Sequence, residues 1–189
     1  GAVQSIVSSG SALMTAMNGR VYKSTDNGDT WFQTDNSIVE FVYFDFVTRI
    51  GNTVYAHGMT VYRTTDEGTT WIDSDGGMAA FFRVDAIASN GTYLFAGGQF
   101  SSTLYRSSDN GDSWQERAPL PSNGMVFQFL GYGNNIFACS PNNGIFISTN
   151  NGGNWTKISN GLPNTNYRYT IEILNNWMFA GTSGNGVWK

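Results

Sequence analysis

Apolar and polar residues alternate along this chain in short runs that are separated by glycine, asparagine and serine. The first 33 residues hold four such runs, at 3–7, 12–16, 20–23 and 31–33, and Asn18-Gly19 joins the second run to the third. Alternation with a period of two predicts strands, and Asn-Gly is a strong signal for a two-residue hairpin. We therefore expect these residues to form one sheet of four short antiparallel strands.

The same succession of runs returns along the rest of the chain. The second and third groups begin with expected strands at 41–47 and 83–88, and the fifth group has three runs without a fourth. A period of about 40 residues is typical of repeat architectures. We expect a single domain of five repeats, at about 1–39, 40–79, 80–122, 123–164 and, incomplete, 165–189.

One octapeptide marks each complete repeat. It reads STDNGDTW, TTDEGTTW, SSDNGDSW and STNNGGNW, and its closing tryptophans are 40, 43 and 41 residues apart. Its aspartate or asparagine can accept backbone hydrogen bonds, its glycine can take a positive φ, and its tryptophan can bury a ring between repeats. We predict a scaffold role for Ser24, Asp26, Gly28, Trp31, Thr64, Asp66, Gly68, Trp71, Ser107, Asp109, Gly111, Trp114, Ser148, Asn150, Gly152 and Trp155.

The octapeptide resembles the Asp-box, or BNR, repeat, whose pattern is S/T-x-D-x-G-x-x-W, with Asn150 in place of aspartate in the fourth copy. The resemblance covers nearly the whole chain. It implies an all-β fold, the β-propeller of sialidases, sorting receptors and photosystem assembly factors, with each box on the turn between the third and fourth strands of a blade.

On this basis we expect a five-bladed β-propeller with a three-stranded last blade. Closure would place residues 3–7 beside residues 169–174 in a compact monomer. Two other arrangements stay open at this point. The chain could be a fragment of a longer propeller, or two chains could close one ring together.

Composition narrows the class of partner. Charged residues make up 13% of the chain, the net charge is −4, and the few lysines and arginines are scattered. This pattern disfavours a nucleic-acid groove and an anionic membrane surface. No apolar run approaches the ~18 residues that would suggest a membrane-spanning helix, so we expect no membrane insertion.

Few residues offer metal or redox chemistry. Cys139 and His57 are each the only residue of their kind, which excludes an internal disulfide and a metal site built from several histidines. The segment 73–77 faintly resembles a calcium loop but lacks the remaining ligands, so a polar turn is the favoured interpretation. We expect no metal and no cofactor.

Aromatic and charged residues near the starts of the innermost strands form the candidate ligand site. The propeller resemblance places the links before these strands around one mouth of the central channel. Such rings can stack on sugars or anchor a protein loop, although they can also pack between blades. Pairs such as Arg83–Asp85 and Arg168–Glu172 could bind a ligand or neutralise each other. The candidate residues are Phe41, Tyr43, Asp45, Phe81, Phe82, Arg83, Asp85, Tyr167, Arg168 and Glu172.

The favoured function is a non-catalytic binding module for glycans or cell-surface protein ligands, extracytoplasmic by the resemblance to secreted Asp-box proteins. The alternative is a glycoside hydrolase of sialidase type. No segment carries the arginine-containing entry motif of sialidases. Asp45 and Asp85 could serve glycoside hydrolysis, but nothing in the sequence makes one the acid and the other the base. Whether the chain is an enzyme therefore stays open, with binding favoured.

Overall fold

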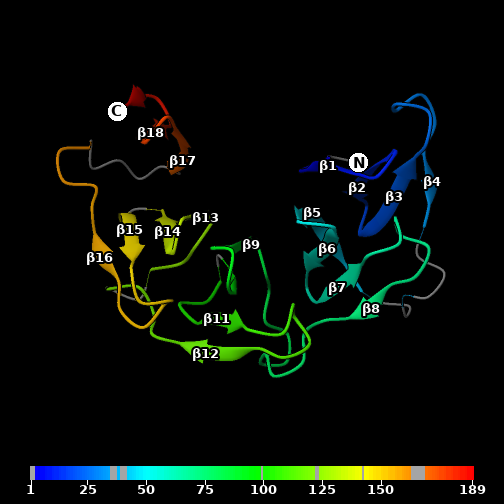
Figure 1. Ribbon diagram of the computed structural model, residues 1–189, viewed down its shortest axis with the longest axis horizontal. Coiled ribbons are helices and arrows are strands. Elements are labelled where there is room, and N and C mark those ends of the chain that lie inside the picture. The colour runs from blue at the N-terminus through cyan, green and yellow to red at the C-terminus, as the bar shows by residue number, and fades with distance from the viewer. Residues whose placement is uncertain are drawn as a thin grey trace. The chain divides into compact units, whose positions relative to one another are not determined.

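The computed structural model describes residues 3–34, 38, 42–98, 100–121, 124–141, 143–162 and 169–189. These residues form five antiparallel sheets in which the strands lie in chain order, so each sheet is a meander (Figure 1). Four sheets have four strands and the last has three. The predicted fold, a five-bladed β-propeller with a three-stranded last blade, is confirmed. In the described part of the chain, no helix has the length and apolar character needed to cross a membrane.

Blades 1 and 2 belong to one compact unit, which comprises residues 1–84 and 111–113. Blade 1 consists of β1 (Ile6–Ser9), β2 (Ala12–Met17), β3 (Arg20–Ser24) and β4 (Phe32–Gln33). Blade 2 consists of β5 (Phe44–Ile50), β6 (Thr53–Gly58), β7 (Val61–Thr64) and β8 (Ile72–Asp73).

Blades 3 to 5 belong to the second unit, which comprises residues 85–110 and 114–189. Blade 3 consists of β9 (Ala86–Ser89), β10 (Leu94–Gly97), β11 (Leu104–Ser107) and β12 (Gln115–Arg117). Blade 4 consists of β13 (Gln128–Tyr132), β14 (Asn135–Ser140), β15 (Gly144–Ser148) and β16 (Thr156–Lys157). Blade 5 consists of β17 (Tyr169–Leu174), β18 (Trp177–Thr182) and β19 (Gly186–Trp188). The expected proximity of residues 3–7 and 169–174 links the two units and stays a prediction.

The innermost strands of blades 2 and 3 begin three residues later than the sequence pattern suggests, at Phe44 and Ala86. In blade 3 the reason is visible at Val84, whose N–H donates to Gly58 O of blade 2 at 2.7 Å instead of pairing within blade 3. Tyr43 and Arg83 therefore lie in the links before these two strands. Of the charged candidates in this part of the chain, Asp45 is the one that lies within a strand, β5.

Each octapeptide closes its turn through a short network of side-chain hydrogen bonds. In the first copy, Ser24 Oγ donates to Asp26 Oδ1 at 2.7 Å and accepts from Gly28 N at 2.8 Å. The Thr30 N–H also donates to Asp26 Oδ1, at 2.9 Å. Asn27 and Gly28 both have positive φ, 60° and 100°, which a turn of this hand requires.

The fourth copy makes the same turn without a charge. Ser148 Oγ donates to Asn150 Oδ1 at 3.0 Å and accepts from Gly152 N at 2.8 Å, and Asn154 N donates to Asn150 Oδ1 at 2.8 Å. An amide oxygen thus replaces the carboxylate, as the sequence predicts.

The tryptophans that close the second and fourth octapeptides pack against the preceding blade. Trp71 Nε1 donates to Thr34 O, and Trp155 Nε1 donates to Ala118 O, both at 3.2 Å. Thr34 and Ala118 each follow directly after the fourth strand of their blade. Both indole rings belong to the buried core between two blades, so the octapeptide joins neighbouring blades as well as its own two strands.

Two of the octapeptide carboxylates make the stability of the fold depend on pH. Hydrogen bonds, chiefly from Thr30, lower the pKa of Asp26 to about 2. Burial would raise the pKa of Asp66, but hydrogen bonds from Thr70 and Thr64 outweigh it and lower the pKa to about 2. A carboxyl group whose pKa is lower in the folded state stabilises the fold above its unfolded pKa of about 4. That contribution is lost as the pH falls from about 4 toward 2.

We expect the variant Asp66→Asn to lose less stability in acid than the parent chain. The asparagine keeps an acceptor for the turn, as Asn150 does in the fourth copy, but it has no proton to take up. The measurement is the free energy of unfolding in urea at pH 7 and at pH 2.5 for both proteins. An identical decrease in the two proteins would show that Asp66 does not contribute to the acid sensitivity.

Candidate functional site

The predicted site residues fall into three groups in the structure. Tyr43, Asp45, Phe81, Phe82 and Arg83 belong to the first unit, whereas Asp85 and Glu172 belong to the second. Phe41, Tyr167 and Arg168 lie outside the described residues. The site that can be built from contacts is therefore the one in the first unit.

Three chain segments meet at one end of blade 2. Met59 N donates to Tyr43 O at 3.0 Å, and Val84 N donates to Gly58 O at 2.7 Å. Gly58 allows this close approach, because a Cβ atom there would lie 2.5 Å from Tyr43 O and 3.1 Å from Asp45 Oδ2. We call the group of Tyr43, Asp45, Gly58 and Arg83 the blade 2 rim.

An ion pair lies at the centre of the blade 2 rim. Arg83 Nη1 and Asp45 Oδ2 are 2.8 Å apart, and both side chains are largely buried. The Oδ2 atom of Asp45 is fully buried, so Arg83 is its close charged neighbour. Arg83 therefore balances the charge of Asp45 at this position.

A small polar pocket of about 110 Å³ opens beside Asp45. Gly19 approaches the Tyr43 ring so closely that a Cβ atom would lie 2.6 Å from it. The pocket is lined by Gln4, Ala16, Met17, Asn18, Gly19, Tyr43, Phe44 and Asp45, so blades 1 and 2 both contribute. A pocket of this volume can hold a small polar group of a ligand, but it is too small for a whole sugar ring or a large side chain.

The candidate aromatic residues differ sharply in their exposure. Phe82 is buried, which matches the alternative that the rings pack inside. Tyr43 is 51% exposed and Phe81 is 89% exposed. Phe81 also has φ of 61°, in a turn that Phe82 N closes by donating to Ala79 O at 3.0 Å. A bulky residue in the left-handed region is rare and unfavourable, so the turn holds this ring in solvent at a conformational cost.

His57 on β6 holds the blade 2 rim in place. Its Nδ1 lies 3.0 Å from Val84 O and its Nε2 lies 2.9 Å from Thr48 Oγ1. Because a carbonyl oxygen only accepts, Nδ1 carries the proton and Nε2 accepts from the threonine hydroxyl. The buried ring also stacks on Phe46 at 5.5 Å. The sequence alone indicates no positioning role for His57, because the residues that it contacts across the fold are distant in the chain. In the sequence it only helps to exclude a metal site built from several histidines.

The candidates in the second unit have different surroundings. Asp85 is buried, and its N–H donates to Gly97 O at 3.0 Å, so its backbone belongs to blade 3. Glu172 is exposed on β17. Between blades 4 and 5, the Gln128 amide accepts from Ile171 N at 2.9 Å and donates to Ile171 O at 3.0 Å, which gives it a structural role.

The described residues contain no group of three or more His, Cys, Asp or Glu side chains that could hold a metal ion. In the segment Asp73–Gly77, Ser74 Oγ donates to Gly111 O at 2.8 Å and Asp75 Oδ2 accepts from Thr60 Oγ1 at 2.7 Å. These side chains make hydrogen bonds within the first unit. Burial raises the pKa of the Cys139 thiol to about 12, so the thiolate that would react is disfavoured.

No protein-family model matches the chain, and no curated protein matches its sequence. Solved structures of similar fold include an ancestral GH74 enzyme, at 19% identity and a TM-score of 0.67 over 100% of this chain. YCF48 bound to D1 peptide is similar at 15% identity and a TM-score of 0.72 over 98% of this chain. The GH74 enzyme of Niastella koreensis is similar at 21% identity and a TM-score of 0.60 over 95%.

The chain spans only part of each of these structures: 31% of the ancestral GH74 enzyme, 62% of YCF48 and 29% of the Niastella koreensis enzyme. At these identities the likeness establishes the propeller fold. It includes glycoside hydrolases and a protein that binds a peptide, so the fold alone does not decide between catalysis and binding.

Proposed function

We propose that this chain is a non-catalytic binding module of the Asp-box class, and that its blade 2 rim, with Phe81, takes an extended peptide segment of a protein ligand. The observation that carries the proposal is the pair of exposed aromatic rings, Tyr43 and Phe81, on the two links that bring Asp45 and Arg83 together. Exposed aromatics beside convergent polar groups are typical of ligand sites.

The chemistry of the blade 2 rim suits a peptide. Tyrosine and phenylalanine rings supply apolar contact area, and Asp45, paired with Arg83, is one of the polar residues that line the neighbouring pocket. The pocket of about 110 Å³ beside Asp45 has room for a small polar group. The similarity to a YCF48 structure that contains a bound peptide supports a protein ligand over a glycan.

Catalysis is the less favoured function. In the first unit, the carboxylate that faces the pocket is Asp45, and Arg83 lies 2.8 Å from it. Glycoside hydrolysis of the retaining or inverting kind requires a second carboxylate that acts with the first.

We expect the variant Phe81→Gly to keep its stability, or to gain up to about 1 kcal/mol, and to lose ligand binding. Glycine removes the cost of a positive φ, which is partly offset by the greater freedom of the unfolded chain. The measurements are urea unfolding and selection of ligands from a peptide library. Phe32→Ser is the matched control, because Phe32 is an exposed ring on the outer strand β4. A loss of more than about 1 kcal/mol in Phe81→Gly, with ligand binding unchanged, would contradict the proposal.

Two further measurements test the remaining parts of the proposal. Incubation with a fluorogenic sialoside should release no product above the rate in buffer, and sustained turnover would favour the hydrolase alternative. We also propose an extracytoplasmic location, on the strength of the Asp-box resemblance. Fractionation of the source cells with an antibody against the chain would test it, and recovery in the cytoplasmic fraction would contradict it.

A further inference from the structure

A basic residue stands directly before each of the first three octapeptides, and in blades 1 and 2 an acid of the following octapeptide balances it. Lys23 Nζ lies 3.5 Å from Glu67 Oε2, and Glu67 is the fourth residue of the second octapeptide. Arg63 forms an ion pair with Asp112, the sixth residue of the third octapeptide. In both cases a cation on the third strand of one blade meets a carboxylate that the next octapeptide supplies.

Arg106 holds the same position in blade 3, but the fourth octapeptide has no acid to offer it. At the two places where the earlier copies carry their acids, the fourth copy, STNNGGNW, has Asn151 and Gly153. Arg106 Nη1 donates instead to the main-chain oxygen of Asn151, at 3.4 Å. The guanidinium also lies over the Tyr93 ring, with Cζ 4.1 Å from the ring centroid. These contacts orient the Arg106 guanidinium without pairing it with a carboxylate.

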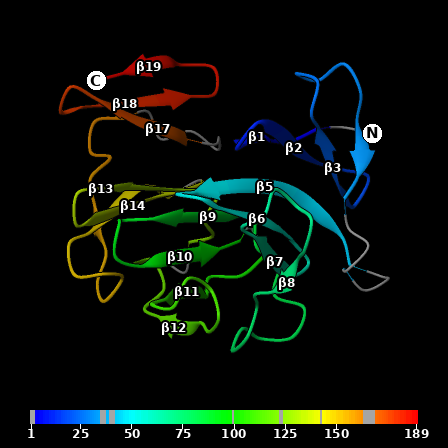
Figure 2. The same ribbon diagram turned by 45° about the vertical axis from the view of Figure 1, so that its right-hand side comes forward.

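A second arginine lies beside the first. β11 and β12 pair with Arg106 opposite Gln115, and Arg117 is two residues further along β12, so both arginines project from one face of blade 3 (Figure 2). Arg117 Nη2 donates to Gln115 Oε1 at 3.0 Å, and Arg117 Cγ lies 3.7 Å from the place of a Cβ atom on Gly152, in the fourth octapeptide. Burial, followed by the neighbouring Arg117 charge, lowers the pKa of Arg106. The two like charges therefore interact.

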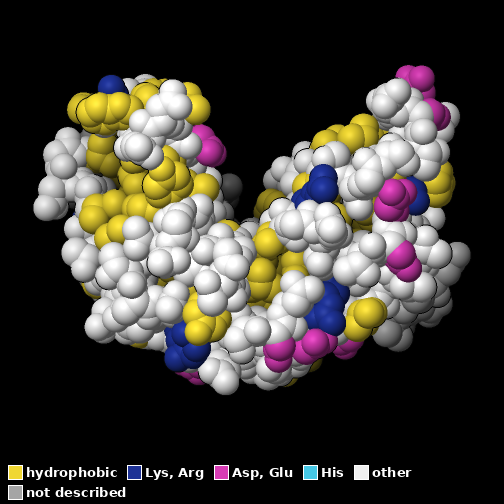
Figure 3. Space-filling view, in the orientation of Figure 1, with side chains coloured by type: hydrophobic (Ala, Val, Ile, Leu, Met, Phe, Trp, Pro, Cys, Tyr) yellow, Lys and Arg dark blue, Asp and Glu magenta, His cyan; other side chains and the backbone are white. Residues whose placement is uncertain are grey.

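Within the described residues, neither of these two arginines forms an ion pair with a carboxylate. Each guanidinium donates one hydrogen bond there, to a neutral oxygen, although it has five N–H groups. Both side chains are partly exposed, and Figure 3 shows lysine or arginine side chains at the surface over β12, at the lower left of that view. An anion from solution can therefore reach N–H groups of the pair.

We propose that Arg106 and Arg117 form a binding site for a tetrahedral oxyanion, a phosphate or sulfate group, beside the fourth octapeptide. Guanidinium groups bind such oxygens through charge-assisted hydrogen bonds, and two of them match the double negative charge of the ion. The ion does for Arg106 what the carboxylate of the following octapeptide does for Lys23 and Arg63. The site lies in the second unit and does not depend on the blade 2 rim.

The test is a titration of the 189-residue chain with sodium sulfate and, separately, with sodium phosphate, while sodium chloride keeps the ionic strength constant. NMR of the backbone amides and of the arginine Nε–H groups follows the binding. We expect saturable shifts that are largest in residues 105–107, 115–117 and 150–154, and the tighter of the two ions identifies the preferred oxyanion. Sodium acetate should bind about tenfold more weakly, because its single charge balances only one guanidinium.

Variants of the chain locate the bound ion. Arg117→Gln removes one guanidinium and should weaken the binding of sulfate and phosphate at least about tenfold. Arg49→Gln is the matched control, since Arg49 is an exposed arginine of blade 2 that also donates to main-chain oxygens. It removes the same charge elsewhere and should bind both ions like the parent chain. Circular dichroism and thermal unfolding report whether each variant keeps the fold.

Gly153→Asp supplies the missing carboxylate from within the chain. Asp112 holds this position in the third octapeptide, where it pairs with Arg63, and Gly153 does not have a positive φ, so the turn can accept an aspartate. We expect the new carboxylate to compete with the ion and to weaken its binding at least about tenfold. Because this variant keeps both arginines, it tests the site independently of the stability of Arg117→Gln.

Any of three results would overturn the proposal. The first is the absence of saturable shifts with either ion at concentrations of tens of millimolar. The second is equal weakening in Arg49→Gln and Arg117→Gln, which would show that the ions respond to the overall charge of the chain. The third is unchanged binding in a folded Gly153→Asp variant, or acetate that binds as tightly as sulfate and phosphate.

Discussion

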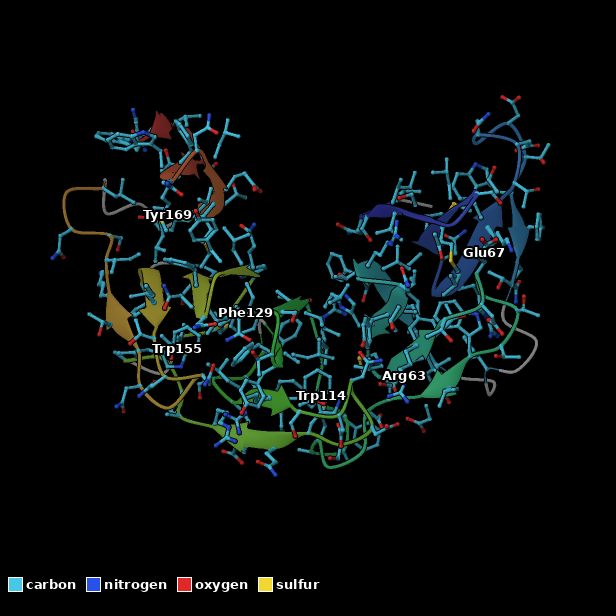
Figure 4. All side chains as sticks on the ribbon, viewed as in Figure 1. Arg63, Glu67, Trp114, Phe129, Trp155 and Tyr169 are labelled. Atoms are coloured by element: carbon cyan, nitrogen blue, oxygen red, sulfur yellow. The ribbon has the colours of Figure 1, made fainter. Side chains whose placement is uncertain are left out.

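The variant Trp155→Ala is expected to lower the free energy of unfolding by about 3–5 kcal/mol, the range for removal of a large buried aromatic ring. Trp155 is buried between blades 3 and 4, its ring centroid lies 6.2 Å from that of Phe129, and its Nε1 donates to Ala118 O (Figure 4). Alanine would leave a cavity in this core and an unpaired carbonyl beside it.

Trp31→Ala is the matched comparison for this prediction. Trp31 holds the same position in the first octapeptide, but it is only partly buried and its indole donates to Gly28 O within its own turn, at 3.0 Å. We expect a markedly smaller loss than for Trp155→Ala in urea unfolding at 25 °C. Equal losses in the two variants would show that the contact of Trp155 with the preceding blade adds no stability beyond that of the turn.

The variant Gly131→Ala is expected to cost about 3 kcal/mol, at the upper end of the usual range for overpacking. A Cβ atom at Gly131 on β13 would lie 1.7 Å from Ser89 O and 2.6 Å from Ser89 C. Both atoms are backbone atoms of β9, so relief requires a shift of one blade against the other rather than a change of rotamer.

Gly133→Ala separates this clash from the ordinary cost of replacing a glycine. Gly133 has φ of 57° and nothing within 4 Å of its Cβ position, so alanine there meets only conformational strain, about 1 kcal/mol. Urea unfolding of the two variants side by side measures the difference. A loss in Gly131→Ala no greater than that in Gly133→Ala would mean that blades 3 and 4 separate at little cost.

The repeated octapeptide made the blades predictable because its interactions are local. Ser24, Asp26 and Gly28 form hydrogen bonds with one another and lie within four residues of sequence, so their spacing is enough to predict the turn. The same holds for the substitution at Asn150, where an acceptor is kept and a charge is removed. Periodicity also predicted the number of sheets and the three strands of the last one among the described residues.

The blade 2 rim could be predicted only in part, since its decisive contacts join distant residues. Asp45 and Arg83 are 38 residues apart, and His57 meets Val84 across 27 residues. The neighbours Phe81 and Phe82 look alike in the sequence, yet a positive φ at Phe81 turns one ring to solvent while the other packs inside. Such a backbone conformation is not expected for phenylalanine, so no sequence rule would have separated the two.

The way in which tryptophan joins two blades also bears on how such a chain can evolve. Trp71 and Trp155 each donate to a main-chain carbonyl of the preceding blade, once at a threonine and once at an alanine. Trp71 also donates to Thr34 Oγ1 at 3.3 Å. Every residue type has a carbonyl oxygen, however, so the main-chain hydrogen bond needs no particular side chain at that position. A duplicated blade can therefore be inserted after another without compensating substitutions at this hydrogen bond.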